Sequence, residues 1–446
     1  MKLDRIRQLV YKLKYRLFFN EKINYYENVI KKNNNLSIAE IEELNWKKRK
    51  DIIEFAYKNI PFYKEYYDDN NFSPQNLIEE QDWGKVPVLT KDKLRSNFDS
   101  LKNPKLKKKY FRLSTTGGST GEPLKILFDT RVPLETIGWR VMKWWDINPW
   151  SNHVYVHRNT HKGISNLVNK LIWFPTLRGL LDSSSINGKS IESFVKRINK
   201  IKPKFIHGYV GAVEELAIYI EKNNLKVHKP EVIFLTSAPL SESTRLNIEK
   251  VFGSDVFDQY GCSEVFWLAA ECKNKKGLHF NYDLRHIEFL DSNNKITKGN
   301  EYGKIVLTDL ENRVFPLIRY ENGDEGRFFI KKYCECGMNL PLIDKVKGRV
   351  SEFIRTESGI YVNGSFLTTL FDGFPDAIKA FQIIQNKDFS ISVNVIPSDS
   401  YTNKCEVFVV KEIKKAIKNE HFVSFNFVEE IKHDRGKTRY IINNSK

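Results

Sequence analysis

The sequence predicts an α/β protein with a large N-terminal domain and a small C-terminal α+β domain. Between about residues 150 and 310, short β-branched or aromatic runs alternate with amphipathic helical stretches, which predicts mixed, substantially parallel sheets and helices. After Gly348-Arg349 the runs become shorter and surround one helical stretch. The 446 residues are too many for one ordinary compact domain. We therefore expect a large domain over residues 1–349 and a small domain over residues 350–446.

The composition is that of a globular protein. Hydrophobic residues make up 41% of the chain and aromatic residues 13%, which is enough for a sizeable core and excludes a largely disordered chain. No apolar run approaches the roughly 18 to 20 residues of a membrane-spanning helix, and the N-terminus lacks the pattern of a secretory signal. We expect a cytoplasmic protein.

The formal charge is +17, because 72 Lys and Arg residues outnumber 55 Asp and Glu residues. A nucleic-acid surface, an anionic membrane or substrate, or compositional bias would each account for it. The charges are scattered, and no helix-turn-helix pattern, aromatic RNA-binding signature or two-pair zinc-finger spacing occurs. We therefore expect no nucleic-acid partner.

Residues 1–20 form a predicted basic amphipathic helix. Apolar residues recur there at helical spacing among lysines and arginines. We expect such a helix to pack on its own domain; the alternative is a peripheral contact with the anionic inner face of a membrane. The apolar positions are Ile6, Leu9, Val10, Leu13 and Leu17.

Local signals predict the other elements. A helical stretch near residues 38–58 is ended by Pro61, and Thr90 is placed to cap a helix that begins at Lys91. Polar loops that follow parallel strands are where nucleotides bind in such folds. Strands are predicted at 204–207, 231–235, 255–257, 381–384 and 390–396, and a helix at 406–418.

The segment Ser114-Thr-Thr-Gly-Gly-Ser-Thr-Gly-Glu-Pro123 carries the first chemical signal. Its three glycines and five hydroxyl residues make a loop whose backbone N–H groups can approach a polyphosphate closely. It is neither a Walker loop nor a dinucleotide fingerprint, and a flexible hydroxyl-rich linker is the alternative. The candidate nucleotide-binding residues are Ser114, Thr115, Thr116, Gly117, Gly118, Ser119, Thr120 and Gly121.

Four more motifs follow this loop: Asp258-Gln-Tyr-Gly-Cys-Ser-Glu264, Pro316-Leu-Ile-Arg-Tyr-Glu-Asn-Gly-Asp324, Gly348-Arg349 and Arg435-Gly-Lys437. Their order and spacing resemble the adenylate-forming (AMP-dependent) ligase superfamily, and within it the phenylacetate–CoA ligase-like branch that includes CapK-type capsular-polysaccharide biosynthesis ligases. The resemblance extends from about residue 59 to the end of the chain. It implies that a hinge joins a mobile small domain to the large one, and that the enzyme uses ATP and Mg²⁺.

The resemblance also assigns roles in nucleotide binding. The Ser114 to Gly121 loop would cradle pyrophosphate, Glu264 would help to hold Mg²⁺, and Asp324 would accept hydrogen bonds from the ribose hydroxyls. Arg349 would contact ribose or phosphate. Tyr260 would stack on the adenine. The remaining nucleotide-binding candidates are Ser237, Ala238, Asp258, Gln259, Gly261 and Ser263, of which the first two lie in a segment that lacks the family's glutamate before Pro239.

Lys437 matches the C-terminal lysine that in this family contacts both the carboxylate and the α-phosphate during adenylation. An ammonium group suits that role as a compact charge between two anions, whereas a lysine in a basic tail is ordinarily solvated. Lys437 and Glu264 are therefore the expected catalytic residues. At the hinge, Ser351 occupies the position where relatives often have Asp or Lys.

Four residues predict a metal site apart from the ATP site. Cys334 and Cys336 have the tight spacing of a zinc knuckle, and Cys272 and His279 lie upstream. Three cysteines and one histidine make a closed tetrahedral Zn²⁺ set, and the resemblance supports it because the branch has a matching Cys…His…Cys-x-Cys pattern. The alternative is a set of reduced thiols. We expect Cys262 to be neither ligand nor nucleophile.

Together these motifs predict an ATP-dependent carboxylic acid ligase that forms an acyl-adenylate and passes the acyl group to CoA or an amine, in capsule or surface-polysaccharide biosynthesis. The partner is a small-molecule carboxylic acid. The resemblance implies an acyl pocket lined by residues around 130 to 215, and the aromatic and basic residues of that region suit a sugar acid at least as well as an aryl acid. His207 and Tyr209 are the leading acyl-pocket candidates. The alternatives are an amide-forming ligase without CoA, a catalytically silent protein with the ligase fold, and a zinc-dependent nucleic-acid binder, which leaves the Ser114 loop unexplained.

Overall fold

The protein is described by a computed structural model. The described residues are 2–18, 20–115, 124–157, 171–183, 186–298, 301–329, 333–347, 353–358, 360–363, 367, 370–371, 374, 377–431 and 439–445.

The chain forms two compact units, and each unit draws on separate parts of the sequence. The first unit comprises residues 1–11, 147–258 and 347–446, and the second comprises residues 12–146 and 259–346. The predicted division into residues 1–349 and 350–446 stays a prediction. The N-terminal helix α1 (Lys2–Phe18) spans the first boundary.

Capping signals set the helices of the second unit. Ser37 begins α4 (Ile38–Asn59) with a capping box, in which its backbone N–H donates to the Glu40 carboxylate at 2.7 Å. Pro61 ends α4 and occupies the first turn of α5 (Pro61–Asp69), and Thr90 caps α6 (Lys91–Ser96), as predicted. The other helical segments are α2 (Asn20–Tyr25), η1 (Tyr26–Ile30), α3 (Lys31–Asn33), η2 (Pro74–Asn76), η3 (Glu80–Lys85), η4 (Lys108–Tyr110) and α7 (Glu135–Trp144).

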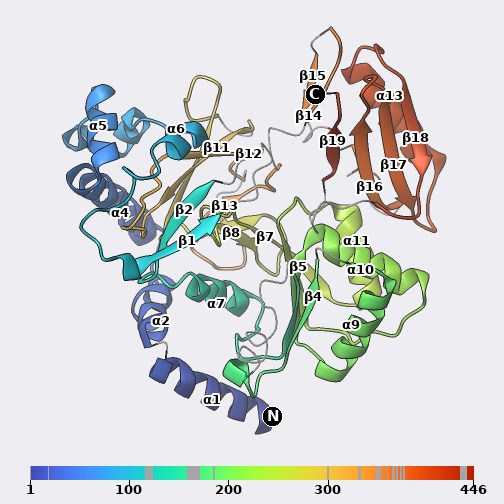
Figure 1. The fold of residues 1–446 in the computed structure, drawn as a ribbon, viewed down its shortest axis with the longest axis horizontal. Coiled ribbons are helices and arrows are strands. Elements are labelled where there is room, and N and C mark those ends of the chain that lie inside the picture. Colours follow the sequence, from blue (N-terminus) through green and yellow to red (C-terminus); the bar gives the residue numbers. More distant parts are fainter. Residues whose placement is uncertain are drawn as a thin grey trace. The chain divides into compact units, whose positions relative to one another are not determined.

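Antiparallel strands complete the second unit (Figure 1). β1 (Phe111–Thr115) and β2 (Lys125–Asp129) form a hairpin. A second sheet has the order β10-β11-β12, with β10 (Arg285–Leu290), β11 (Gly303–Asp309) and β12 (Tyr320–Gly326). A third group has the order β13-β9-β8-β7, with β7 (Asp255–Tyr260), β8 (Ala269–Glu271), β9 (Leu278–Phe280) and β13 (Leu342–Ile343).

The first unit contains the predicted parallel sheet, with the order β7-β6-β5-β3-β4. Residues 255–258 of β7 pair here, whereas residues 259–260 pair with β8. Helices α9, α10 and α11 lie against this sheet (Figure 1) and share one apolar core with it. The bounds are β3 (His153–His157), β4 (Arg178–Asp182), β5 (Phe205–Tyr209), β6 (Val232–Thr236), α9 (Gly188–Ile201), α10 (Val210–Lys222) and α11 (Glu242–Phe252).

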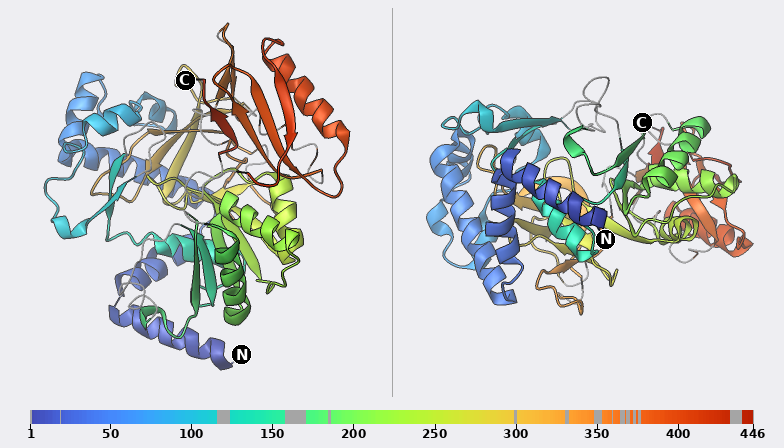
Figure 2. Two further views of the ribbon diagram at one scale, coloured as in Figure 1. Left: turned by 45° about the vertical axis from the view of Figure 1, so that its right-hand side comes forward. Right: turned by 90° about the horizontal axis from the view of Figure 1, so that it is seen from below.

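The C-terminal segment of the first unit has its own mixed sheet, with the order β18-β17-β16-β19, and its own apolar core. Helix α13 (Asn403–Ala416) packs on one face of this sheet (Figure 2), where its Val409 and Ile413 share the core with Val393. The strands are β14 (Phe353–Arg355), β15 (Tyr361–Asn363), β16 (Ile378–Gln385), β17 (Ile391–Pro397), β18 (Val423–Phe427) and β19 (Ile441–Asn443). The predicted fold class is thereby confirmed. Among the described residues no helix is both long and apolar enough to cross a membrane.

Candidate active site and metal centre

The predicted phosphate loop joins the two strands of the β1–β2 hairpin. Ser114 pairs with Ile126 and Thr115 pairs with Lys125, which is the last pair before the loop. Because the strands are antiparallel, the two ends of the loop lie side by side. Thr116, Gly117, Gly118, Ser119, Thr120 and Gly121 themselves lie outside the described residues.

The Tyr-Gly motif begins in the last residues of β7 and continues into the loop after it. Asp258, Gln259 and Tyr260 are the last residues of the strand, so Gly261, Ser263 and Glu264 occupy the loop after it. Gly261 is dictated by close packing, because a Cβ there would lie only 3.1 Å from the backbone nitrogen of Trp267. Gln259 Nε2 donates to the carbonyl of Tyr260 at 2.9 Å. The motif therefore turns sharply where a strand ends, which is the usual place for nucleotide recognition in such sheets.

Hydrogen bonds connect this motif with the motif that ends at Asp324. The Tyr260 hydroxyl donates to Asp324 Oδ2 at 2.9 Å. Asn322 Nδ2 donates to Tyr260 Oη at 2.7 Å and to Asp324 Oδ2 at 3.0 Å. Tyr320 Oη donates to Glu264 Oε1 at 3.0 Å. The second unit therefore links the predicted magnesium carboxylate and the predicted ribose carboxylate to side chains of the same strand, β12.

The hydroxyl and thiol groups around these carboxylates stay protonated at neutral pH. Burial, followed by the charge of Asp324, raises the pKa of Tyr260 well above its usual value. Burial, followed by the charge of Glu264, raises the pKa of Tyr320 and of Cys262. The tyrosines consequently donate hydrogen bonds to Glu264 and Asp324. Cys262 remains a thiol, which is a poor nucleophile.

Sequence reasoning missed Tyr320 and Asn322. Both lie inside the recognised motif, and the strand β12 places residues 320, 322 and 324 on one face because side chains alternate along a strand. That alternation was the available signal. Gly323, which sits between two of them with φ of 84°, has a backbone conformation that other residues rarely adopt.

The first unit holds the other predicted nucleotide residues. Ser237 and Ala238 follow β6 directly. Ser237 has φ of 82°, in the left-handed region, and strained positions of this kind cluster at functional sites. Arg349, Ser351 and Lys437 lie outside the described residues, so their predicted roles stay predictions.

The acyl-pocket candidates form a histidine and aromatic cluster at the carboxyl ends of β3 and β5. The His207 ring stacks on Phe234 with centroids 4.2 Å apart and meets His157 edge-on at 4.4 Å. Tyr209 stacks on His157 at 4.7 Å. Burial lowers the pKa of His157 to about 4 and also lowers that of His207. Both imidazoles are therefore neutral at pH 7, each with one donor and one acceptor nitrogen.

The four predicted metal ligands converge in the second unit. The ligand atoms of Cys272, His279, Cys334 and Cys336 all lie within 4.8 Å of one another. Cys272 Sγ is 3.8 Å from Cys334 Sγ, and Cys336 Sγ is 3.3 Å from His279 Nε2. A tetrahedral ion with Zn–S bonds of about 2.3 Å separates two sulfurs by about 3.8 Å. The donor set and its spacing therefore fit Zn²⁺.

The surroundings orient these ligands. His279 Nδ1 lies 2.9 Å from the carbonyl of Leu340, so it carries the proton and leaves Nε2 to face the sulfurs. The backbone N–H of Asn274 donates to Cys272 Sγ at 3.4 Å. Such contacts are the usual outer shell of a structural zinc site.

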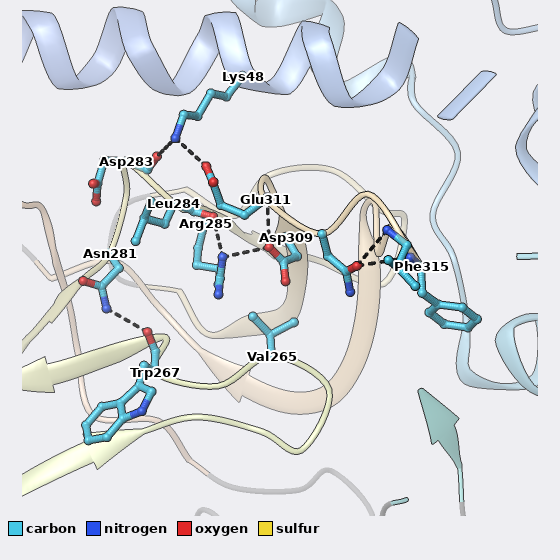
Figure 3. Close-up of polar contacts among 12 residues, drawn as sticks. Lys48, Val265, Trp267, Asn281, Asp283, Leu284, Arg285, Asp309, Glu311 and Phe315 are labelled. Carbon is cyan, nitrogen blue, oxygen red and sulfur yellow. Dashed lines mark hydrogen bonds and ion pairs between the residues drawn. The ribbon is translucent and has the colours of Figure 1, made fainter. Parts of the chain in front are cut away.

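A buried polar network supports the loop after the Tyr-Gly motif (Figure 3). Asn281 Nδ2 donates to the carbonyl of Trp267 at 2.7 Å and so ties this loop to the segment before β10. In the same network, Arg285 Nη1 donates to Asp309 Oδ1 at 2.7 Å, and Lys48 Nζ of α4 donates to the carbonyl of Asp283 at 3.0 Å. These contacts join α4, β10 and β11 into one support.

The sequence is similar to two groups of known proteins. Residues 354–444 match the family model described as the CapK C-terminal domain. The chain is 27% identical to Protein CapK of Staphylococcus aureus, over 99% of this chain and 97% of that protein. It is 23% identical to the phenylacetate–coenzyme A ligase of Pseudomonas putida, over 71% of each.

Solved structures show the same fold. 2-Hydroxyisobutyryl-CoA ligase, in the postadenylation state with R3-HIB-AMP, matches 92% of this chain and 91% of that chain with a TM-score of 0.74 and 17% identity. An anthranilate CoA ligase with anthranoyl-AMP matches 73% of this chain and 65% of that chain with a TM-score of 0.50 and 13% identity. The sequence relatives confirm the predicted enzyme class, an adenylate-forming ligase, and the solved structures show the fold. The chain is thus a homologue of CapK and of the phenylacetate–CoA ligases, with the fold of the adenylate-forming ligases.

Proposed function

We propose that this protein activates a small carboxylic acid with ATP and transfers the acyl group to CoA, in the biosynthesis of a capsule or surface polysaccharide. The observation that carries the proposal is the linked pair of carboxylates in the second unit. Glu264 and Asp324 come from motifs that are far apart in the sequence. Tyr320 of β12 donates a hydrogen bond to Glu264, and Tyr260 of β7 donates one to Asp324. The similarity to Protein CapK over almost the whole chain supports the polysaccharide setting.

In the first half-reaction a carboxylate oxygen attacks the α-phosphorus of ATP, and pyrophosphate leaves. Glu264 would hold Mg²⁺, since carboxylate oxygen is a ligand that this ion prefers, and the ion would neutralise phosphate charge. Asp324 would accept hydrogen bonds from the ribose hydroxyls and fix the nucleotide. Lys437 would bridge the carboxylate and the α-phosphate.

In the second half-reaction the thiol sulfur of CoA attacks the acyl carbonyl, loses its proton, and AMP leaves. CoA is the proposed acceptor because the sequence relatives include phenylacetate–coenzyme A ligases, such as that of Pseudomonas putida. An amine acceptor, which would give an amide, is the alternative. The acid itself would lie at the His157, His207 and Tyr209 cluster, where neutral imidazoles can exchange hydrogen bonds with the hydroxyls of a sugar acid.

The test is ATP-dependent pyrophosphate release over a panel of aryl, fatty, amino and uronic acids, each with and without CoA. We expect release with one class of acid, and thioester formation when CoA is present. Release with an acid and amide formation from an added amine, without any effect of CoA, would replace CoA by the amine acceptor. Silence across the panel would favour the catalytically silent ligase fold.

Variants assign the roles. We expect Glu264→Gln and Lys437→Ala each to lower the adenylation rate at least 100-fold, which is the usual scale for lost electrostatic stabilisation, while Asp324→Asn should mainly weaken ATP binding. Lys415→Ala is the matched control, because Lys415 is an exposed lysine of the same C-terminal segment. Equal rates for Lys437→Ala and Lys415→Ala would contradict the role of Lys437.

A structural Zn²⁺ completes the proposal. Four protein ligands leave no open position, so the ion would tie the segment around Cys272 to the segment of Cys334 and Cys336 without taking part in catalysis. We expect about one zinc per chain, and its loss together with a lower melting temperature in Cys334→Ser/Cys336→Ser. Cys405→Ser is the control, since Cys405 is a buried cysteine of the C-terminal core. Equal zinc content in both variants would place the metal elsewhere.

A further inference from the structure

Helix α1 turns its apolar stripe toward solvent. Exposed fractions are 52% for Ile6, 70% for Leu9, 57% for Leu13 and 68% for Leu17. These positions are three or four residues apart, so they share one face of the helix. A helix of a globular domain normally buries such a face against its core. The packing of α1 on its own domain, expected from the sequence, therefore leaves this stripe uncovered.

The opposite side of α1 holds it on the first unit. Tyr11 is buried, and its ring lies 5.8 Å from that of Trp150 and 6.1 Å from that of Trp173. Arg7 Nε donates to the carbonyl of Pro175 at 3.4 Å. Tyr11 and Arg7 therefore attach the helix to the first unit, and the apolar stripe lies on the face that points away from these contacts.

Positive charge borders the stripe. At 100° per residue, Arg5, Lys12 and Arg16 fall along one border of the stripe, and all three are exposed. Lys14 falls along the other border. Residues 5–18 contain no acidic residue. An apolar stripe with cationic borders is the arrangement of helices that lie in the plane of an anionic membrane surface.

The segment that α1 contacts is apolar on its surface as well. Within residues 171–177, which include the contact residues Trp173 and Pro175, four large apolar side chains are exposed. Their exposed fractions are 65% for Leu171, 48% for Ile172, 64% for Phe174 and 43% for Leu177. Two segments that are distant in sequence but in contact thus both expose apolar residues.

We propose that α1 and residues 171–177, together called the docking surface, bind the protein to an anionic lipid bilayer. The apolar side chains would enter the boundary between headgroups and acyl chains, and the basic borders of α1 would pair with anionic headgroups. A bilayer accommodates an open, charge-bordered stripe of about 17 Å along one helix. The inference concerns this surface alone and does not depend on the proposed catalytic chemistry.

The experiment is flotation of the full chain with vesicles of phosphatidylcholine, either pure or with one third phosphatidylglycerol. We expect binding to the anionic vesicles that is at least tenfold stronger than to the neutral ones, and weaker at high salt because the charge contribution is screened. Leu9→Gln/Leu13→Gln should lose at least tenfold in binding. Arg5→Gln/Lys12→Gln/Arg16→Gln should lose most of the preference for phosphatidylglycerol.

Matched controls carry the same changes elsewhere. Ile78→Gln/Phe422→Gln removes two apolar side chains that are 83% and 71% exposed outside the docking surface. Lys58→Gln/Lys64→Gln/Lys196→Gln removes three exposed charges outside it. A melting temperature for each variant separates loss of binding from loss of fold. Equal vesicle binding by the docking-surface and control variants would overturn the proposal. So would a parent protein that ignores vesicles and forms a dimer that Leu9→Gln/Leu13→Gln dissociates.

Discussion

Buried arginine–carboxylate pairs of the second unit and two buried groups of the first unit show two ways of burying an ionisable side chain. In the second unit, fully buried arginines pair with carboxylates, as Arg140 does with Asp283 at 2.7 Å and Arg319 with Glu288 at 2.9 Å. In the first unit, Glu214 and His157 are packed without a countercharge, and burial raises the pKa of Glu214 to about 8 and lowers that of His157 to about 4. The two arginine–carboxylate pairs keep their charges inside the protein, whereas burial favours the neutral forms of Glu214 and His157.

The difference predicts where each unit is sensitive. A buried charge becomes unfavourable when its partner is replaced. The stability of the second unit is therefore sensitive to substitution of either member of such a pair. A buried neutral group becomes charged when the pH changes. Glu214 and His157 therefore make the free energy of unfolding depend on pH. Although burial alone would raise the pKa of Asp283, the charge and hydrogen bonds of Arg140 lower it.

The largest expected effect comes from breaking a pair. Arg140→Met should lower the free energy of unfolding by about 3 to 5 kcal/mol, because it leaves the Asp283 carboxylate buried without its countercharge. Urea unfolding measures this loss. Arg140→Met/Asp283→Leu is the control, and it should recover most of the loss. A single variant as stable as the parent would contradict the view that pairing stabilises this unit.

The next effect comes from replacing a buried carboxylic acid that stays protonated at neutral pH with a side chain that cannot ionise. The pKa of Glu214 is raised in the folded state above its value in the unfolded chain, so its contribution to stability is complete at pH 4 and is lost as the pH rises toward 8. Glu214→Gln removes this loss. The variant should match the parent near pH 4.5 and exceed it by about 4 kcal/mol at pH 8.

Urea unfolding at both pH values makes the measurement. Glu221→Gln is the matched control on the same helix, because Glu221 accepts contacts from Lys379 and Lys250. That variant should lose stability at neutral pH instead of gaining it. A Glu214→Gln variant with the pH profile of the parent would show that Glu214 is not the group that titrates.

His157 gives the opposite pH dependence with a lesser magnitude. Its folded pKa of about 4 lies below that of an unfolded histidine, so stability is complete above about pH 6.5 and is lost as the pH falls toward 4. His157→Phe preserves the stacking shape. It should equal the parent at pH 7.5 and be more stable by about 2 kcal/mol at pH 5, as thermal unfolding would record. Stability that is equal at both values would count against this assignment.

The smallest change in the free energy of unfolding is expected at exposed ion pairs. Lys31 and Glu27 on the N-terminal helices pair at 2.9 Å, but both side chains are at least half exposed. Lys31→Ala should leave the free energy of unfolding nearly unchanged, because solvent and salt screen such pairs. A loss of the size expected for Arg140→Met would show that burial is not what separates the two cases.

Elements with local signals could be predicted from the sequence. The strand expected at 204–207 is β5, and the helix expected at 406–418 is α13. The motif order identified the relatives, and the Cys and His spacing identified four side chains that converge. In each case the signal lies within a few residues of the feature that it predicts.

Features that depend on distant segments could not be predicted. Arg140 and Asp283 are 143 residues apart, and neither sequence neighbourhood points to the other. The periodicity of residues 1–20 indicates an apolar face, but not whether that face meets the core or solvent. Tyr320 and Asn322 were within reach of strand alternation, yet their contacts with Glu264 and Tyr260 require the fold of β7 against β8 and of β12 against its sheet.

Each unit is assembled from segments that a ribosome produces at different times. Residues 12–146 emerge well before residues 259–346, and at about 5 to 20 residues per second the interval is roughly 10 to 40 s. During this interval Ile52 and Ile53 of α4 lack Phe289 of β10, with which they share a core. Residues 147–258 likewise precede residues 347–446. We therefore expect the nascent chain to need chaperone protection until its final third has been synthesised.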